Sequence, residues 1–244
     1  MIAATRRLAR RLRRDTGGLA MIEFAFTLPL VVAIGGWGTE LSFLALTNLR
    51  ISQYALTLAD NASRVGMSAS GGVTQLREAD VNDVLQGTRI DGKGINLTTY
   101  GRVTLSSLEM VQRYYSDGSS DSAPVQRLHW QRCIGMMSGT GYDSTYGTTS
   151  ISAGSDKTPG NAGTAMPNGM GDAGKKVTMA SLPGNGAMFV EINYRYKPAF
   201  GGMFVSPQVV HYSASFIVRD NRDYAMLYNP SPNATPSTCD KHNI

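Results

Sequence analysis

A run of sixteen uncharged residues, 24–39, follows a block of arginines, and this combination constrains the fold more than any other feature. The apolar character resumes after Glu40 and continues to residue 49. A bilayer core of about 30 Å needs about 20 helical residues, so residues 21–44 can span a membrane once if Glu40 lies near the far interface. The six arginines before the run predict that the N-terminal end stays in the cytoplasm. The chain from about residue 50 onward is then expected on the other side of the membrane.

The positive charge of the chain is confined to its N-terminal end. Six of the 23 basic residues and one of the 18 acidic residues lie within residues 1–18, which leaves 17 of each in the rest of the 244-residue chain. Nucleic-acid binding needs a clustered basic face that neutralises phosphates. The neutral remainder therefore argues against nucleic-acid binding by the folded part, which we expect to be one domain.

A secretory signal peptide has the same order of a basic segment followed by an apolar one. Under that alternative, residues 33–35 (Ala-Ile-Gly) would form the small-residue cleavage site, and the pair Arg6-Arg7 hints at a twin-arginine signal. This alternative leaves two features unexplained: the acidic Glu23 at the start of the apolar run, and the helical pattern that continues beyond residue 35.

The start of the apolar run has a further order, in which Gly18 is followed by four apolar residues and then by Glu23 and Phe24. This order resembles the processing site of type IV prepilins, which implies that a prepilin peptidase cuts between Gly18 and Leu19 on the cytoplasmic face. The patterns EFA (23–25), LP (28–29) and GTE (38–40) are similar to those of the TadE-like family of tight-adherence (Tad, Flp-type) pilus proteins. The resemblance is close over residues 17–66 and loose beyond them, where it rests on the run MFVEINYRYKP and a strand ending in Arg219.

Each residue of the prepilin-like pattern has a physical role. Gly18 has no side chain, so an extended backbone can enter a peptidase cleft, while the arginines hold the bond at the cytoplasmic surface. Cleavage would give Leu19 a cationic amine, which Glu23 of the same or a neighbouring subunit can neutralise. Since an unpaired carboxylate in hydrocarbon costs about 2.5–3.5 kcal/mol, this pairing would set the register of subunits. Alternatively, Glu23 is a solvated acid at the headgroup level, which the helix dipole also favours.

The apolar helix is expected to continue beyond the membrane to about Met67. Small and apolar positions recur with a spacing of three and four residues from Leu41 to Val65. This stripe predicts a face buried against the folded domain rather than a seam between subunits, although a helical fibre would use both. Pro29 and the glycines at 35, 36 and 38 predict soft turns within the span.

The rest of the chain predicts an α+β domain. The segment 73–87 has the pattern of a short amphipathic helix that Gly87 closes. Segments 102–111, 125–134, 187–196 and 209–219 are rich in β-branched and aromatic residues and predict an antiparallel sheet packed on the C-terminal half of the long helix. The stretch 135–174 is rich in Gly, Ser and Thr, and we expect a long surface loop that buries little.

The expected organisation has four parts. Residues 1–18 form a basic cytoplasmic leader, and residues 19–69 form the transmembrane helix with its continuation. Residues 70–228 form the α+β domain on the far side of the membrane, and residues 229–244, which contain three prolines, form an extended tail. The only cysteines, Cys133 and Cys239, lie on the far side of the membrane, where a disulfide would tie the tail to the sheet. Two free buried thiols are the alternative.

No arrangement of residues in the sequence supports catalysis. The three histidines, His129, His211 and His242, lack the spacing of a zinc site, and the first two lie in strand patterns where hydrogen-bonded structural roles are expected. No phosphate-binding loop or nucleophile elbow is present. The acidic residues of the polar stretches do not form an EF-hand loop and would at most bind calcium weakly: Asp117, Asp121, Asp143 and Asp156. We therefore expect a protein that is not an enzyme and holds no metal or cofactor.

These expectations together describe a single-pass protein of a bacterial inner membrane with its C-terminal domain in the periplasm. The resemblance implies a minor pilin or pseudopilin that acts in assembling or priming a tight-adherence type IV pilus. Its implied partners are the prepilin peptidase, the major pilin, other pilin-like subunits and inner-membrane lipid, and the mature chain could enter the extracellular pilus. Two alternatives remain: a pseudopilin of a secretion system, and an uncleaved envelope protein whose periplasmic domain binds a ligand.

Overall fold

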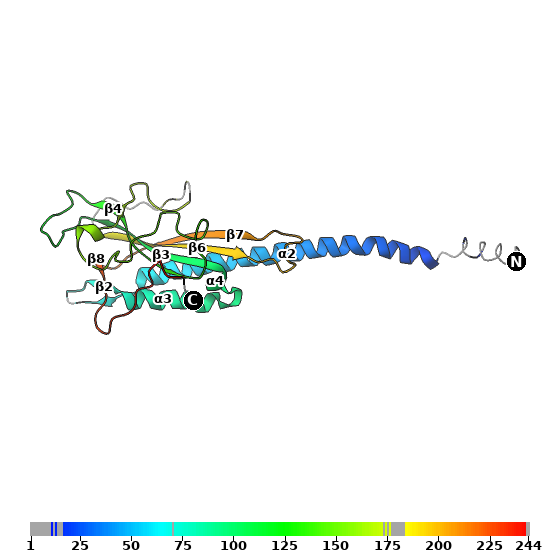
Figure 1. The fold of residues 1–244 in the computed structure, drawn as a ribbon, viewed down its shortest axis with the longest axis horizontal. Helices are drawn as coiled ribbons and strands as arrows, with labels where there is room; N and C mark the ends of the chain where they lie inside the picture. Colours follow the sequence, from blue (N-terminus) through cyan, green and yellow to red (C-terminus); the bar gives the residue numbers. More distant parts are fainter. Residues whose placement is uncertain are drawn as a thin grey trace. The chain divides into compact units, whose positions relative to one another are not determined.

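The computed structural model describes residues 11, 13, 17–69, 71–172, 174, 176 and 184–242. A long apolar helix is followed by a small domain of helices and mainly antiparallel strands, which confirms the predicted α+β class (Figure 1). Most of the basic leader lies outside the described residues, as do the last two residues of the tail.

Helix α2 (Gly17–Arg64) dominates the N-terminal part of the chain. Its 48 residues correspond to a length of about 72 Å. Pro29 and the three glycines at 35, 36 and 38 all lie inside the helix, which runs through them without interruption. The hydroxyl groups of Thr27, Thr39 and Ser42 donate hydrogen bonds to backbone carbonyls three or four residues earlier. These polar side chains therefore satisfy their hydroxyl groups within the helix, as is common in membrane helices.

The chain divides into two compact units. The first comprises Met1–Ala45 together with Lys197–Pro207, which is the loop between strands β6 and β7. The second comprises Leu46–Tyr196 and Gln208–Ile244, and it contains the rest of α2 and both sheets. The limit between them falls inside α2, whereas the sequence analysis placed the limit of the domain after residue 69.

The part of α2 in the second unit has a fully buried face. Ile51, Ala55, Leu58, Ala59 and Ala62 are each at most 2% exposed and recur at a spacing of three or four residues. The stripe recognised in the sequence is therefore a core face of this chain over residues 51–62, as predicted. Leu41, at the N-terminal end of the stripe, is 40% exposed and does not join that core.

The main sheet has five strands in the order β5-β4-β3-β6-β7, and all its pairs are antiparallel. Its four long strands match the four predicted segments, and β5 is a two-residue addition at the edge: β3 (Gly101–Val111), β4 (Val125–Ile134), β5 (Thr164–Ala165), β6 (Asn185–Tyr196) and β7 (Gln208–Ile217). The central strand β3 is buried along almost its whole length, because it pairs with β4 on one side and β6 on the other.

A second, three-stranded sheet was not predicted. It contains β1 (Met67–Ser68), β2 (Thr74–Arg77) and β8 (Arg222–Tyr228), and β2 and β8 pair in parallel. This sheet corrects the predicted end of the long helix, because α2 stops at Arg64 and the chain enters β1 instead of continuing to Met67. The guanidinium of Arg222 donates to the carbonyls of Ala62, Ser63 and Val65, so it binds carbonyls that a helix end leaves without partners.

The short amphipathic helix lies later in the chain than predicted. Helix α3 (Glu78–Asp91) begins after β2, and Gly92 forms its C-cap. Gly87 therefore lies inside α3 rather than at its end, and no atom lies within 4 Å of the position of a Cβ there. Helix α3 is followed by the 3-10 helix η1 (Gly92–Ile95) and the short helix α4 (Leu97–Tyr100), which leads directly into β3.

The stretch 135–174 has little regular structure, as expected, but it contributes to the core. It contains the 3-10 helix η2 (Pro159–Asn161) and β5. Met170 is fully buried in a cluster with Leu108, Leu128 and Phe189, and the ring of Tyr146 meets that of Phe189 edge-on at 5.7 Å between centroids. The expectation that this stretch buries little is therefore wrong, because two large side chains within it cover one face of the sheet.

Candidate functional site

The first unit exposes a continuous apolar helix surface. Within α2, the most apolar window of 18 residues has a mean hydropathy of 2.0, and none of it is buried. This is the one described helix long and apolar enough to cross a membrane, a criterion that signal sequences also meet. Large side chains from Leu19 to Trp37 are between 44% and 75% exposed, so water would contact an apolar surface that soluble proteins normally cover.

The predicted cleavage residues, Gly18 and Leu19, lie in the first turn of α2. Apart from the helix's own backbone, no described atom lies within 4 Å of the position that a Cβ on Gly18 would take. In this structure the backbone at Gly18 is helical. Because glycine weakens a helix by about 1 kcal/mol relative to alanine, Gly17 and Gly18 make this first turn easy to unwind.

Glu23 lies one turn after Leu19 on the same face of the helix, because residues four apart are neighbours on a helix surface. Its side chain is exposed, and its carboxylate has no hydrogen-bond or ion-pair partner within the part of the chain that the structure describes. The pairing predicted for Glu23 therefore requires a group that the described residues do not present.

Glu40, the other acid of the apolar segment, is completely buried. Its Oε1 accepts a hydrogen bond of 3.1 Å from the backbone N–H of Ala199, and its Oε2 accepts one of 3.1 Å from that of Phe200. Both donors belong to the loop Lys197–Pro207, which lies in the same unit as Glu40. Glu40 is thus bound by a loop 160 residues away, and the sequence analysis missed this contact because no local pattern connects the two segments.

The same loop contacts α2 a second time, one turn before Glu40. A Cβ on Gly36 would lie 2.5 Å from the ring of Phe204, so only glycine allows this ring to approach the helix so closely. The ring of Phe200 meets that of Phe204 edge-on, with 5.5 Å between centroids. Gly36 and Glu40 together therefore form a binding face on α2 for the loop.

The buried charges of the second unit serve its structure. Glu78 of α3 pairs with Arg132 of β4, and both side chains are at most 3% exposed. The carboxylate of Glu109 accepts one hydrogen bond from the hydroxyl of Ser107 and one of 2.7 Å from the guanidinium of Arg113. Its Oε1 also lies 3.1 Å from Nδ1 of His129. Ser107 bonds to the glutamate and not to the histidine, and the imidazole is inaccessible to solvent, so these three residues do not form an activated nucleophile. His129 is therefore a hydrogen-bonded structural histidine, as predicted.

The other histidine in a strand, His211, also matches its predicted structural role. Its Nδ1 lies 2.5 Å from Oδ1 of Asn193 on the neighbouring strand β6. The third, His242, follows the last regular element of the chain and has no assigned role in the fold.

The acidic residues considered for calcium are separated by the fold. Asp117 and Asp156 each accept hydrogen bonds from a residue two positions later, Ser119 and Thr158, and these bonds lower the pKa of both carboxyls. Among the described residues, no group of three or more potential metal ligands occurs. Asp117 and Asp156 therefore each stabilise their own turn, whereas Asp121 pairs with Arg127 of β4 at 3.1 Å.

Cys133 and Cys239 form a disulfide, as the sequence analysis proposed. The bond joins β4 to the C-terminal tail, which runs from residue 229 without helix or strand up to residue 242. The buried guanidinium of Arg102 holds the same tail by donating to the carbonyls of Cys239 and Lys241, and burial lowers its pKa. The tail is extended, as expected, but it is fixed to the sheet at several points.

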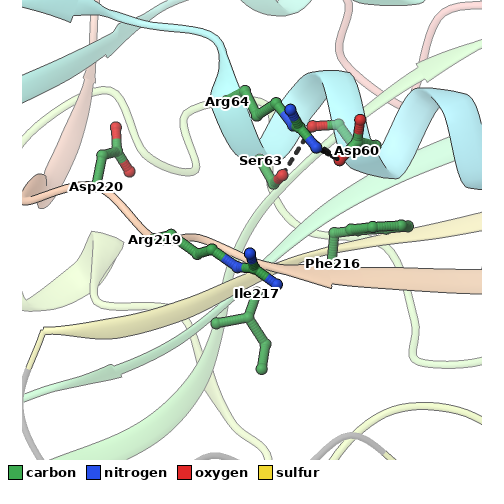
Figure 2. A pocket seen from close by; sticks show the side chains of 7 residues that line it. All are labelled: Asp60, Ser63, Arg64, Phe216, Ile217, Arg219 and Asp220. Atoms are coloured by element: carbon green, nitrogen blue, oxygen red, sulfur yellow. Dashed lines mark hydrogen bonds and ion pairs between the residues drawn. The ribbon is translucent and has the colours of Figure 1, made fainter.

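An open hollow of the second unit, about 420 Å³, lies where the end of α2 meets the end of β7 (Figure 2). Asp60 and Arg64 of α2 form an ion pair of 2.8 Å at its rim, and Figure 2 shows Arg219 and Ile217 on the opposite wall. Its lining is mixed in charge, with two aspartates and two arginines.

Comparisons of the chain with protein-family models, with curated proteins and with solved structures find no match.

Proposed function

We propose that this chain is a minor pilin or pseudopilin of a tight-adherence type IV pilus system, which acts in pilus assembly or priming after a prepilin peptidase removes the leader. In this proposal α2 spans the bacterial inner membrane once, and the second unit lies in the periplasm. The proposal rests on the sequence pattern around Gly18 and on one structural observation. Of the two acids in the apolar half of α2, Glu40 is bound by a loop of the chain, whereas Glu23 has no partner among the described residues.

The contrast between Glu40 and Glu23 supports this role. Glu40 has both carboxylate oxygens bound by backbone N–H groups, so its charge is stabilised without a partner molecule. Glu23 is exposed in a helix segment that otherwise presents apolar side chains, where an unpaired carboxylate costs about 2.5–3.5 kcal/mol. A carboxylate at that position therefore favours a cationic partner, and the amine that cleavage would create on Leu19 lies about 6 Å away along the axis.

The second unit supports a periplasmic location for the folded part. The disulfide Cys133–Cys239 is typical of oxidising compartments, whereas thiols in the cytoplasm are kept reduced. The concentration of positive charge before α2 gives the matching orientation, because basic segments remain on the cytoplasmic side.

N-terminal sequencing of the full-length protein, extracted from membranes of cells that contain the peptidase, tests the proposal. The expected mature chain begins at Leu19, and Gly18→Val should abolish processing while the neighbouring Gly17→Val leaves it intact. A chain that retains Met1 beside fully processed sibling pilins would instead support the uncleaved envelope protein. A chain that begins after residue 35 would identify α2 as a signal peptide.

The role of Glu23 needs a separate measurement, because cleavage alone does not show assembly. Glu23→Gln keeps the size of the side chain and removes its charge, and Thr27→Ala changes the same helix face one turn later. We expect both variants to be inserted and cleaved normally, with incorporation into pili reduced only for Glu23→Gln. Equal amounts of both variants in sheared pili would reject the pairing role.

A further inference from the structure

We propose that the loop Lys197–Pro207 is a second membrane anchor, which inserts apolar side chains into the outer leaflet beside α2. This inference rests on the membrane span in the proposed function, and it is independent of cleavage and of assembly into a pilus. The ligand is the lipid bilayer itself, at the boundary between hydrocarbon and headgroups on the periplasmic side.

The loop is fixed to the spanning part of α2 by two contacts. The buried carboxylate of Glu40 binds the N–H groups of Ala199 and Phe200, and the ring of Phe204 lies on the bare backbone of Gly36. Gly36 and Glu40 are four residues apart and so lie on one face of the helix. The loop and the helix segment Met1–Ala45 accordingly form one compact unit, although β6 and β7 on either side of the loop belong to the other.

The positions of these contacts along α2 place the loop at the far edge of the bilayer. If the span begins at Leu19, Gly36 lies about 26 Å further along the axis and Glu40 about 32 Å further. The hydrocarbon core is about 30 Å thick. The contact of Phe204 with Gly36 therefore falls just inside the hydrocarbon boundary, and Glu40 falls just outside it.

The exposed side chains of the loop suit this environment. Met203 is 80% exposed and Phe200 is 45% exposed, and residues 197–207 include one lysine and no acidic residue. On α2 at the same level, Trp37 is 54% exposed, and tryptophan is enriched at membrane interfaces. Together these residues present an exposed apolar tip.

The contact with Glu40 also explains how an irregular loop can enter this region. Backbone N–H groups near hydrocarbon must be bonded within the protein, because water is scarce there. Glu40 binds two of them, and the N–H of Met203 donates to the carbonyl of Phe200 at 3.2 Å. Glu40 and the loop therefore satisfy each other's hydrogen-bonding groups at the edge of the hydrocarbon.

Spin labelling of the full-length chain in lipid nanodiscs tests the anchor. Single cysteines replace Met203 in the loop, Phe26 in the middle of the span and Tyr114, which is 75% exposed in the second unit. The disulfide-bonded Cys133 and Cys239 do not react if the protein stays oxidised. We expect the labels at Met203→Cys and Phe26→Cys to collide mainly with membrane-dissolved oxygen, and the label at Tyr114→Cys to collide mainly with an aqueous nickel chelate.

Two glycine variants separate loop binding from general helix damage. Gly36→Val places methyl groups where the Phe204 ring lies, whereas Gly35 has no atom within 4 Å of its Cβ position, so Gly35→Val is the matched control. We expect Gly36→Val to expose the Met203→Cys label to the chelate, while Gly35→Val does not and the Phe26→Cys label stays in lipid in both.

Each other outcome overturns a defined part of the inference. If Met203→Cys is as accessible to the chelate as Tyr114→Cys while Phe26→Cys is in lipid, the loop is not an anchor and the span remains. If Phe26→Cys is also accessible, the span itself is wrong. If Met203→Cys is protected only in assembled pili, the loop contacts a neighbouring subunit and not lipid.

Discussion

Removing the disulfide should cause a large loss of stability in the second unit. The bond between Cys133 and Cys239 joins residues 106 positions apart, and the chain-entropy model gives about 5 kcal/mol at 25 °C for a loop of that length. The tail would keep its other contacts: the bonds from Arg102, the 2.7 Å bond from the N–H of Cys133 to the carbonyl of Ser237, and the 2.7 Å bond from Ser237 to Asn82. These contacts act on the folded state and do not replace a constraint on the unfolded state.

The perturbation is the double variant Cys133→Ala/Cys239→Ala, since alanine fills a buried site without adding a polar group. Urea unfolding in nanodiscs can be followed by the fluorescence of Trp130, which is 2% exposed on the same strand as Cys133, in a Trp37→Phe background. We expect the free energy of unfolding to fall by about 4–5 kcal/mol, matched by chemical reduction of the unmutated bond. A loss no larger than the extrapolation error, about 10–15% of the total, would refute the entropic reasoning.

Two further predictions concern buried charge and pH. Glu78→Ala leaves the buried guanidinium of Arg132 without its carboxylate, so the free energy of unfolding should fall by about 3–5 kcal/mol. Asp60→Ala, which removes the exposed pair with Arg64, should change that free energy by less than about 1 kcal/mol. Similar losses for the two variants in urea unfolding would contradict this prediction. Burial and a hydrogen bond to Asp223 raise the pKa of Tyr228 to about 12 from 10.0, so the folded state holds this proton more tightly. The stabilisation that this pKa shift gives the folded state is complete below about pH 10 and is lost as the pH rises to about 12. Tyr228→Phe should therefore reduce the fall in melting temperature between these two pH values. An unchanged slope would exclude Tyr228 as a source of that fall.

The elements that the sequence predicted correctly are those with strong local patterns. The spacing of three and four residues from Ile51 to Ala62 identified a buried helix face, and alternation of β-branched and aromatic residues identified the four long strands. The interior of a long helix and the centre of a sheet depend mainly on such local periodicity.

The errors arose where distant segments compete for the same residues. The predicted helix extension to Met67 failed because Met67 and Ser68 pair with β2, and the predicted helix start near residue 73 failed because Thr74–Arg77 pairs with β8. Gly87 does not end α3, since one unfavourable glycine costs only about 1 kcal/mol and packing of the helix outweighs it. These outcomes depend on pairings that a local window of sequence does not contain.

The candidate site was predictable only in part for the same reason. Gly18, Leu19 and Glu23 form a local motif, and the structure places them in the first two turns of α2. The partner of Glu40 lies 160 residues away in a loop whose composition resembles that of many turns. The signal available in the sequence was an acidic residue next to a long apolar run. If such a carboxylate is buried, it needs hydrogen-bond donors from another part of the chain.

The return of the chain to α2 through the loop Lys197–Pro207 has a mechanical consequence. Backbone passes between the two units at three places: inside α2 after Ala45, at the end of β6 and at the start of β7. A force that pulls the N-terminal part of α2 out of the membrane would be distributed over these three connections. This holds as long as the contacts of Glu40 and Gly36 with the loop persist. The pulling force would then act on β6 and β7 as well as on α2. We therefore expect the second unit to stay folded under this force and not to unfold from its N-terminal end.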